Sequence, residues 1–265
     1  MAYDFPASLT VEQRGHIAVL TLDRVAKRNA LDGPTVTALG RFFEEPPDWA
    51  RAAVIAAHGE HFSAGLDLSE LVERDAYGGV LHSRGWHRMF SAIEYGTLPV
   101  VSALKGAVVG AGLELAATTH IRVAERSTFY ALPEGQRGIF VGGGAAVRVS
   151  RLIGVSRMTD LMLTGRVLDA AEGERLGLAH YLVDDGEGLA KAVALAERIA
   201  ENSPVSNYAV LHSLPRIAEA DPETGLMMES LMAGVAQAST EAKERLTAFL
   251  EGRAAKVRPV GGDGR

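Results

Sequence analysis

The chain has 265 residues, of which 47% are apolar and 23% charged, so it is long enough for one large core and has the composition of a folded globular protein. Its formal net charge of −6 at pH 7 argues against a nucleic-acid partner, because such proteins present a concentrated basic face. The absence of cysteine excludes disulfides, thiolate metal sites and cysteine nucleophiles.

The first residues, M-A-Y-D-F-P-A-S, lack the basic-then-apolar pattern of a signal peptide. No uninterrupted apolar run reaches the roughly 20 residues that a membrane-spanning helix needs. The sequence therefore predicts a soluble cytoplasmic protein without a membrane or nucleic-acid partner.

Strand-like and helix-like segments alternate through the first half of the chain. Residues 16–23 predict a strand, and Asp32 and Thr35 offer cap groups for a helix from Pro34 towards Phe43. Short apolar runs predict further strands at 51–58 and 98–104, with two more inside 121–132. Glycine-rich loops follow the first two of these runs, at 59–68 and 106–112, and the second loop leads into a helix near Gly112 or Leu113.

Helical spacing dominates elsewhere. Between 69 and 95 the pattern predicts a helix with a weak break at Gly78 and Gly79, and another helix follows the glycines at 142–144. Asp169 is a candidate N-cap for a short helix. Helices are also predicted at 187–201, 204–218 and 222–250. The alternation predicts an α/β fold followed by a helical C-terminal region.

Two glutamates stand out because glycine and apolar residues surround them. Glu114 lies in G-A-V-V-G-A-G-L-E-L-A and Glu134 in L-P-E-G-Q-R-G-I-F-V-G-G-G. Burial favours the protonated form of a carboxyl group, and glycine lets backbone amides approach a ligand closely, so the pair suggests general acid/base chemistry. The plainer alternatives are a helix-terminal glutamate at 114 and a surface turn residue at 134.

Four sequence blocks in this order resemble the enoyl-CoA hydratase/isomerase, or crotonase, superfamily. They are R-V-A-K-R-N-A-L from Arg24, H-F-S-A-G-L-D-L from His61, and the two segments that contain Glu114 and Glu134. The segments L-T-G-R-V-L-D-A-A-E and A-F-L-E-G-R-A-A-K extend the match towards the C-terminus. The resemblance implies a crotonase-like spiral of ββα units over 1–200 and a helical trimerisation region over 201–265, in a homotrimer or a dimer of trimers.

The resemblance also implies an acyl-CoA thioester as substrate and assigns residues to it. The backbone N–H groups of Leu66 and Ala111 correspond to the oxyanion hole, Glu114 to the base that activates water, and Glu134 to the acid that protonates the α-carbon. Coenzyme A belongs to the substrate, so no separate cofactor and no metal is expected. Its implied contacts come from two loops: Arg24, Lys27, Arg28, Ala64, Asp67 and Leu68. Lys256 and Arg258 could add positive charge.

The expected reaction is the reversible addition of water to a 2-enoyl-CoA, which gives a 3-hydroxyacyl-CoA. An enoyl-CoA isomerase, a thioester hydrolase and a non-catalytic acyl-CoA-binding protein remain open alternatives on the same scaffold. A stripe of large side chains between 77 and 90 is either ordinary core or the lining of an acyl pocket; its members are Tyr77, Trp86, Met89 and Phe90. Asp67 reads as a residue that structures its loop, and the spacing of His58, His61, His82 and His87 matches no metal motif.

Overall fold

A computed structural model describes residues 5–70 and 75–253 of the chain. It divides into two compact units, Met1–Glu201 and Asn202–Arg265. None of the helices in the described ranges combines the length and the apolar character that crossing a bilayer requires.

The first unit is built on a six-stranded sheet. Its strands follow the order β1-β2-β3-β4-β6-β9, with β1 antiparallel to β2 and every other neighbouring pair parallel. The strands are β1 (Leu9–Arg14), β2 (Ile17–Leu22), β3 (Ala52–Ala57), β4 (Val100–Leu104), β6 (Ile121–Glu125) and β9 (Tyr181–Val183). Helices cover both faces of this sheet, which explains why β2, β3 and β4 are almost entirely apolar.

A second, smaller sheet of the first unit is built from short strands. It contains β5 (Ala107–Val109), β7 (Phe129–Ala131) and β8 (Leu168–Asp169), and Ser63 forms an isolated parallel bridge to Val108. The chain thus passes three times from the large sheet to the small one and then into a helix. These turns run from β3 through Ser63 to α2, from β4 through β5 to α3, and from β6 through β7 to α4. The predicted spiral of ββα units is confirmed.

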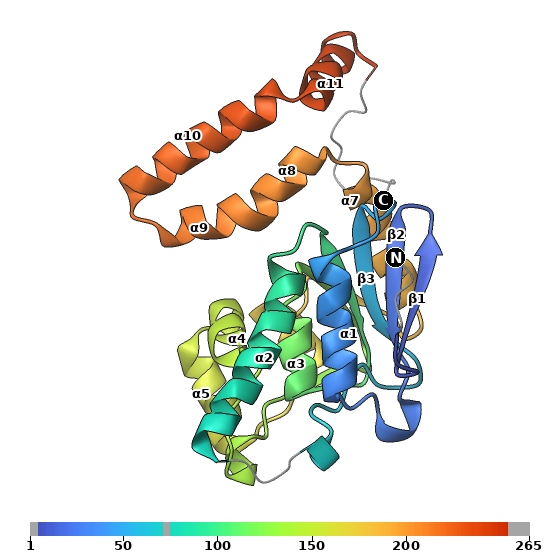
Figure 1. Cartoon of the computed structure of the whole chain (residues 1–265), viewed down its shortest axis with the longest axis vertical. Coiled ribbons are helices and arrows are strands. Elements are labelled where there is room, and N and C mark those ends of the chain that lie inside the picture. Colours follow the sequence, from blue (N-terminus) through green and yellow to red (C-terminus); the bar gives the residue numbers. More distant parts are fainter. Residues whose placement is uncertain (1–4, 71–74, 254–265) are drawn as a thin grey trace, which may run out of the picture. The chain divides into compact units, whose positions relative to one another are not determined.

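Seven helices belong to the described part of the first unit. They are α1 (Gly33–Glu44), α2 (Ala76–Glu94), α3 (Ala111–Ala116), α4 (Ala145–Ile153), α5 (Val155–Thr164), α6 (Ala170–Leu176) and α7 (Gly188–Ala200). Helix α7 lays Ala192, Ala196 and Ala200 against one face of the large sheet, while α1 and α2, which run side by side in Figure 1, contribute to the core on the other face. Asp32 caps α1, as predicted, by accepting a hydrogen bond from the amide of Thr35.

Some expectations for the first unit are wrong. Helix α2 passes through Gly78 and Gly79 without a break, because Asp75 caps the helix on the Gly78 amide and both glycines lie in the first turn. Leu68–Glu70 forms a 3-10 turn where a helix was predicted, and the prediction for 71–74 falls outside the described residues. Strands β1, β5 and β9 and helix α5 had no counterpart in the sequence prediction.

The second unit is helical, as predicted, but it is divided more finely. Its helices are α8 (Pro204–Tyr208), α9 (Leu214–Glu219), α10 (Pro222–Ala238) and α11 (Thr240–Leu250), with a π-helical turn at Ala209–Ser213. Pro215 in the first turn of α9 has no N–H group to continue a regular ladder, which accounts for the π turn just before it. The expected single helix over 222–250 breaks at Ser239, which adopts an extended backbone and caps α11.

Candidate active site

Both predicted acids line one cavity of about 680 Å³ in the first unit. Three glycine-containing loops and helix α2 form its walls. The loops contribute Ala64 to Leu66 with Leu68, Val109 to Ala111, and Ile139 to Gly143, and the residues from α2 include Val80, His82, Ser83, Arg84 and Trp86. The segment from Ala64 follows the Ser63 bridge, that at Val109 to Ala111 joins β5 to α3, and that at Ile139 to Gly143 leads into α4.

Glu114 lies in the first turn of α3 and is 4% exposed. Its Oε1 atom accepts hydrogen bonds from the amides of Gly143, at 2.8 Å, and Ala145, at 3.2 Å. The glutamate therefore satisfies amides at the beginning of α4, which has no side-chain cap of its own. Burial raises the pKa of Glu114, while the Ala145 and Gly143 amides oppose that rise.

Arg148 on α4 supports the loop that holds Glu114. Its guanidinium group forms an ion pair with Glu94, with Nε to Oε2 at 2.6 Å, and donates from Nη1 to the Gly143 carbonyl at 3.0 Å. Because Arg148 is 9% exposed, this pair lies largely in the interior. The sequence reading missed both residues. No local sequence signal marks this pair, because the two residues lie 54 positions apart.

Glu134 begins the 3-10 turn Gly135–Arg137 directly after β7 and Pro133. Its Oε2 atom is buried and has no hydrogen-bond partner among the described residues. Burial raises the pKa of Glu134, and the negative charge of Glu114 raises it further. The two acids therefore influence each other's ionisation and titrate as a coupled pair.

The amides of Leu66 and Ala111 are both placed to act as donors. In the parallel bridge between Leu31 and Leu66, the hydrogen bonds run from Leu31 N to Gly65 O and from Asp67 N to Leu31 O, which leaves the Leu66 amide directed away from Leu31. Ala111 is the first residue of α3, so its amide has no acceptor within the helix. Within 5–70 and 75–253, neither amide donates to a protein acceptor.

Two glycines leave room for Glu134 and the two amides to lie close together. Gly110 has φ +53°, and a Cβ atom there would lie 2.7 Å from Glu134 Oε1. Gly65 has φ +102°, and a Cβ atom there would lie 2.9 Å from Val109 O and 3.6 Å from Ala111 N. Larger residues would strain the backbone and fill the space between the second acid and the two amides.

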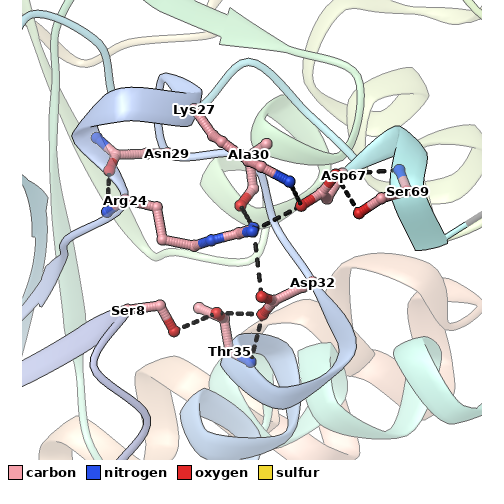
Figure 2. A network of polar contacts seen from close by, with 9 residues as sticks. All are labelled: Ser8, Arg24, Lys27, Asn29, Ala30, Asp32, Thr35, Asp67 and Ser69. Atoms are coloured by element: carbon pink, nitrogen blue, oxygen red, sulfur yellow. Dashed lines mark hydrogen bonds and ion pairs between the residues drawn. The ribbon is translucent and has the colours of Figure 1, made fainter.

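The predicted coenzyme A contacts separate into two groups. Ala64 and Leu68 line the cavity, whereas Arg24 and Lys27 bind the carboxylate of Asp67 beside it, at 2.6 and 2.9 Å (Figure 2). Arg28 is exposed, and its carbonyl accepts a hydrogen bond from the Ala64 amide. Lys256 and Arg258 lie outside the described residues.

Asp67 is the centre of the network in Figure 2. It also accepts hydrogen bonds from the backbone and hydroxyl groups of Ser69, and Arg24 continues the network to Asp32 and the Ala30 carbonyl. Lys27, Arg24 and Ser69 hold the pKa of Asp67 well below its usual range. Asp67 thus fixes the loop that carries the Leu66 amide.

The remaining candidates differ in position. Trp86 lines the cavity, and Phe90 packs against it in the core, whereas Met89 lies in a groove between α1 and α2 and Tyr77 is exposed. Over the described residues, no three His, Asp or Glu side chains gather as a metal site would require. Ile139 and Phe140, which the sequence reading did not single out, are exposed on the cavity wall.

Comparisons with known proteins agree with this architecture. The family model for enoyl-CoA hydratase/isomerase matches residues 12–258. The enoyl-CoA hydratase EchA19 of Mycobacterium tuberculosis is 33% identical over 251 residues, which cover 92% of this chain and 94% of that protein.

Solved structures give the same result. The "putative enoyl-CoA hydratase from Rhodopseudomonas palustris CGA009" is 56% identical, with a TM-score of 0.92 and coverage of 97% of this chain and 100% of that one. A protein from Thermobifida fusca YX, solved in complex with acetoacetyl-CoA, is 27% identical, with a TM-score of 0.80 and coverage of 88% and 95%.

Proposed function

The chain belongs to the enoyl-CoA hydratase/isomerase family, and from this premise we propose that it is an enoyl-CoA hydratase, which adds water reversibly to a 2-enoyl-CoA. The observation that carries the proposal is the geometry of one cavity, in which two carboxyl groups with raised pKa values lie beside two amides that have no acceptor among the described residues. Hydration needs a base and an acid at the same time, together with donors for the charge that develops on the thioester oxygen.

Each group has a defined task in the proposed reaction. The Leu66 and Ala111 amides bind the thioester oxygen, and Glu114 accepts a proton from the water whose oxygen attacks the β-carbon. The electron pair of the double bond then forms an enolate that the two amides stabilise. Glu134 donates its proton to the α-carbon, which gives the 3-hydroxyacyl thioester. This division requires Glu114 to begin charged and Glu134 to begin neutral, within a pair of acids that titrate together.

Coenzyme A enters as part of the substrate, and no further cofactor takes part in the proposed reaction. Ala64 and Leu68 on the cavity wall support its placement there, with Lys27 and Arg28 on the neighbouring loop as candidates for its phosphates. The complex of the Thermobifida relative with acetoacetyl-CoA supports an acyl-CoA ligand. The proposal also includes a cytoplasmic location and a homotrimer or dimer of trimers.

Purified protein mixed with crotonyl-CoA tests the proposal. Loss of the ultraviolet absorbance of the conjugated thioester, with a product heavier by one water, is the expected result. Isomerisation would leave the mass unchanged, and hydrolysis would release free coenzyme A. If the protein binds acyl-CoAs but converts none of a panel of short, long and branched enoyl-CoAs, the hydratase proposal is wrong.

Substitution of the acids provides the matched test. Glu114→Gln and Glu134→Gln should each lower kcat by at least about 10²-fold, in the range typical of losing a general acid or base, while leaving the Kd for butyryl-CoA within a few-fold of the wild-type value. Glu12→Gln is the control, because the Glu12 side chain is exposed on β1, pairs with Arg14 and is not among the residues that line the cavity.

A further inference from the structure

Two cavities meet at the same pair of side chains on α2. The active-site cavity has a neighbour of about 460 Å³ in the groove between α1 and α2. Trp86 and His82 line both cavities, and no other described residue does. Their side chains therefore form the partition between the two spaces.

The partition is firmly packed. Trp86 is 7% exposed and meets Phe90 edge to face, with the ring centroids 5.6 Å apart, while the His82 ring lies 5.8 Å from Trp86 on its other side. Aromatic pairs at such distances and angles are mutually attractive. Trp86 is therefore held in position by neighbours on successive turns of its own helix.

The partition also lies close to the reacting atoms. A Cβ atom on Gly143 would lie 2.6 Å from Glu114 Oε2 and 3.0 Å from Phe90 Cε2, so Glu114 and Phe90 contact the same small residue. The β-carbon of a substrate must lie beside Glu114 for that acid to activate the attacking water. Trp86 lines the same cavity as Glu114 and is backed by the buried Phe90, so an acyl chain that runs from Glu114 along this wall meets the indole ring.

We infer that Trp86, together with His82, ends the acyl-binding part of the cavity and restricts this enzyme to short-chain enoyl-CoAs. The inference rests on the proposed function, since it concerns the acyl group that lies between the two acids. A longer chain would meet the indole ring, and the space behind it is edged by the charged groups of Arg41, Glu44 and Arg88. Removal of the indole ring would join the two cavities.

Binding of saturated acyl-CoAs tests this inference independently of turnover. The Kd values of butyryl-CoA and decanoyl-CoA are measured by calorimetry for the wild type and for Trp86→Ala, Trp86→Leu and His82→Ala. In the wild type, decanoyl-CoA should bind no more tightly than butyryl-CoA, although it has six more methylene groups. In Trp86→Ala the ratio of the two Kd values should move at least about tenfold in favour of decanoyl-CoA.

The control is Leu81→Ala, because Leu81 is exposed on α2 and lines only the second cavity. Its Kd ratio should equal that of the wild type. If Trp86→Ala does not fold, Trp86→Leu and His82→Ala should shift the ratio in the same direction by a smaller factor. Tighter binding of decanoyl-CoA by the wild type, or an unchanged ratio in every folded partition variant, would overturn the inference. A wild type that binds these ligands without hydrating crotonyl-CoA would overturn only the proposed function.

Discussion

Asp67 acts on the proposed oxyanion hole through the backbone. Its own amide donates to Leu31 O, its side chain binds Lys27 and Arg24, and the preceding residue, Leu66, lines the cavity. The ion pairs of Asp67 with Arg24 and Lys27 therefore fix the position of the Leu66 amide without contacting it. A misplacement of about 1 Å at a reacting group can cost 10²-fold in rate.

We therefore predict that Asp67→Asn lowers kcat for crotonyl-CoA by about ten- to a hundredfold. Asparagine keeps the size of the side chain but loses the charge that binds Arg24 and Lys27. Because the pKa of Asp67 is lowered in the folded protein, its stabilising effect is present at neutral pH and is lost as pH falls below the ordinary range of aspartate. Urea titrations should show the variant less stable than the wild type at pH 7, with the difference shrinking at acidic pH. An unchanged kcat would contradict a positioning role.

For the two catalytic candidates, Glu114 and Glu134, folding stability depends on pH in the opposite direction. Burial raises the pKa of Glu114 and Glu134, so the native state keeps protons that the unfolded chain releases, and stability falls as pH rises from about 4.5 through the raised values. Glu114→Gln should therefore unfold at a higher temperature than the wild type at pH 8.5, by a few degrees, with a smaller advantage at pH 5.5. Glu12→Gln should gain nothing at either pH, because Arg14 lowers the pKa of Glu12. A Glu114→Gln variant less stable than the wild type at pH 8.5 would show that the hydrogen bonds from the Gly143 and Ala145 amides to the carboxylate outweigh the cost of its desolvation.

Sequence patterns predicted the two acids of the candidate site but not the ion pairs that hold the surrounding loops in place. Glu114 and Glu134 were visible because carboxyl groups are unusual among glycine and apolar residues. The ion pairs of Arg24 with Asp67, 43 positions apart, and of Arg148 with Glu94, 54 apart, depend on how the spiral superposes its turns. No local pattern records that superposition.

At the scale of elements, the beginning of α4 and the side chain of Glu114 form one structure. Gly143 leaves just enough room for the carboxylate, and its backbone lies outside the left-handed region that favours glycine. Gly143→Ala should therefore act by crowding Glu114 Oε2 and Phe90, and not by straining the backbone. We expect kcat to fall by about 10²-fold and stability to fall by about 1–3 kcal/mol, as in other overpacked sites.

The neighbouring glycine provides a matched control for that prediction. A Cβ atom on Gly142 would meet nothing closer than Ser83 Oγ, at 3.9 Å. Gly142→Ala should therefore retain kcat within a few-fold and unfold at nearly the wild-type urea concentration. If both variants lose activity equally, the loss comes from the cavity wall in general and not from contact with Glu114.

Elements with strong periodicity or caps were predictable, and short or interrupted ones were not. The runs that became β2, β3 and β4 are buried on both faces, and α1 has Asp32 as its cap, so their local signals agree with their environment. Strands β5 and β9 have three residues each and form because the spiral supplies a neighbouring strand. The break between α10 and α11 was hidden because Ser239 can continue a helix or, as here, cap the next one.

At the scale of the whole molecule, the second unit exposes an unusual amount of apolar surface. On α10, four large side chains are each more than half exposed, namely Leu226, Met227, Leu231 and Val235, and α11 adds Leu246, Phe249 and Leu250. Apolar surface gathered in this way commonly marks a protein–protein interface. This observation supports the proposed assembly into trimers.

The assembly can be tested by charging that surface. Sedimentation equilibrium of the wild type should give a mass three or six times the 28.1 kDa of one chain. The double variant Leu226→Glu and Leu231→Glu should sediment as a monomer, because a trimer would have to desolvate the introduced glutamate carboxylates, two from each chain, at its interfaces. Glu229→Gln, an exposed polar change on the same helix, should leave the mass unchanged. A wild type that sediments at 28.1 kDa would contradict the proposed trimer, and a double variant that keeps the wild-type mass would place the interface on another surface of the chain.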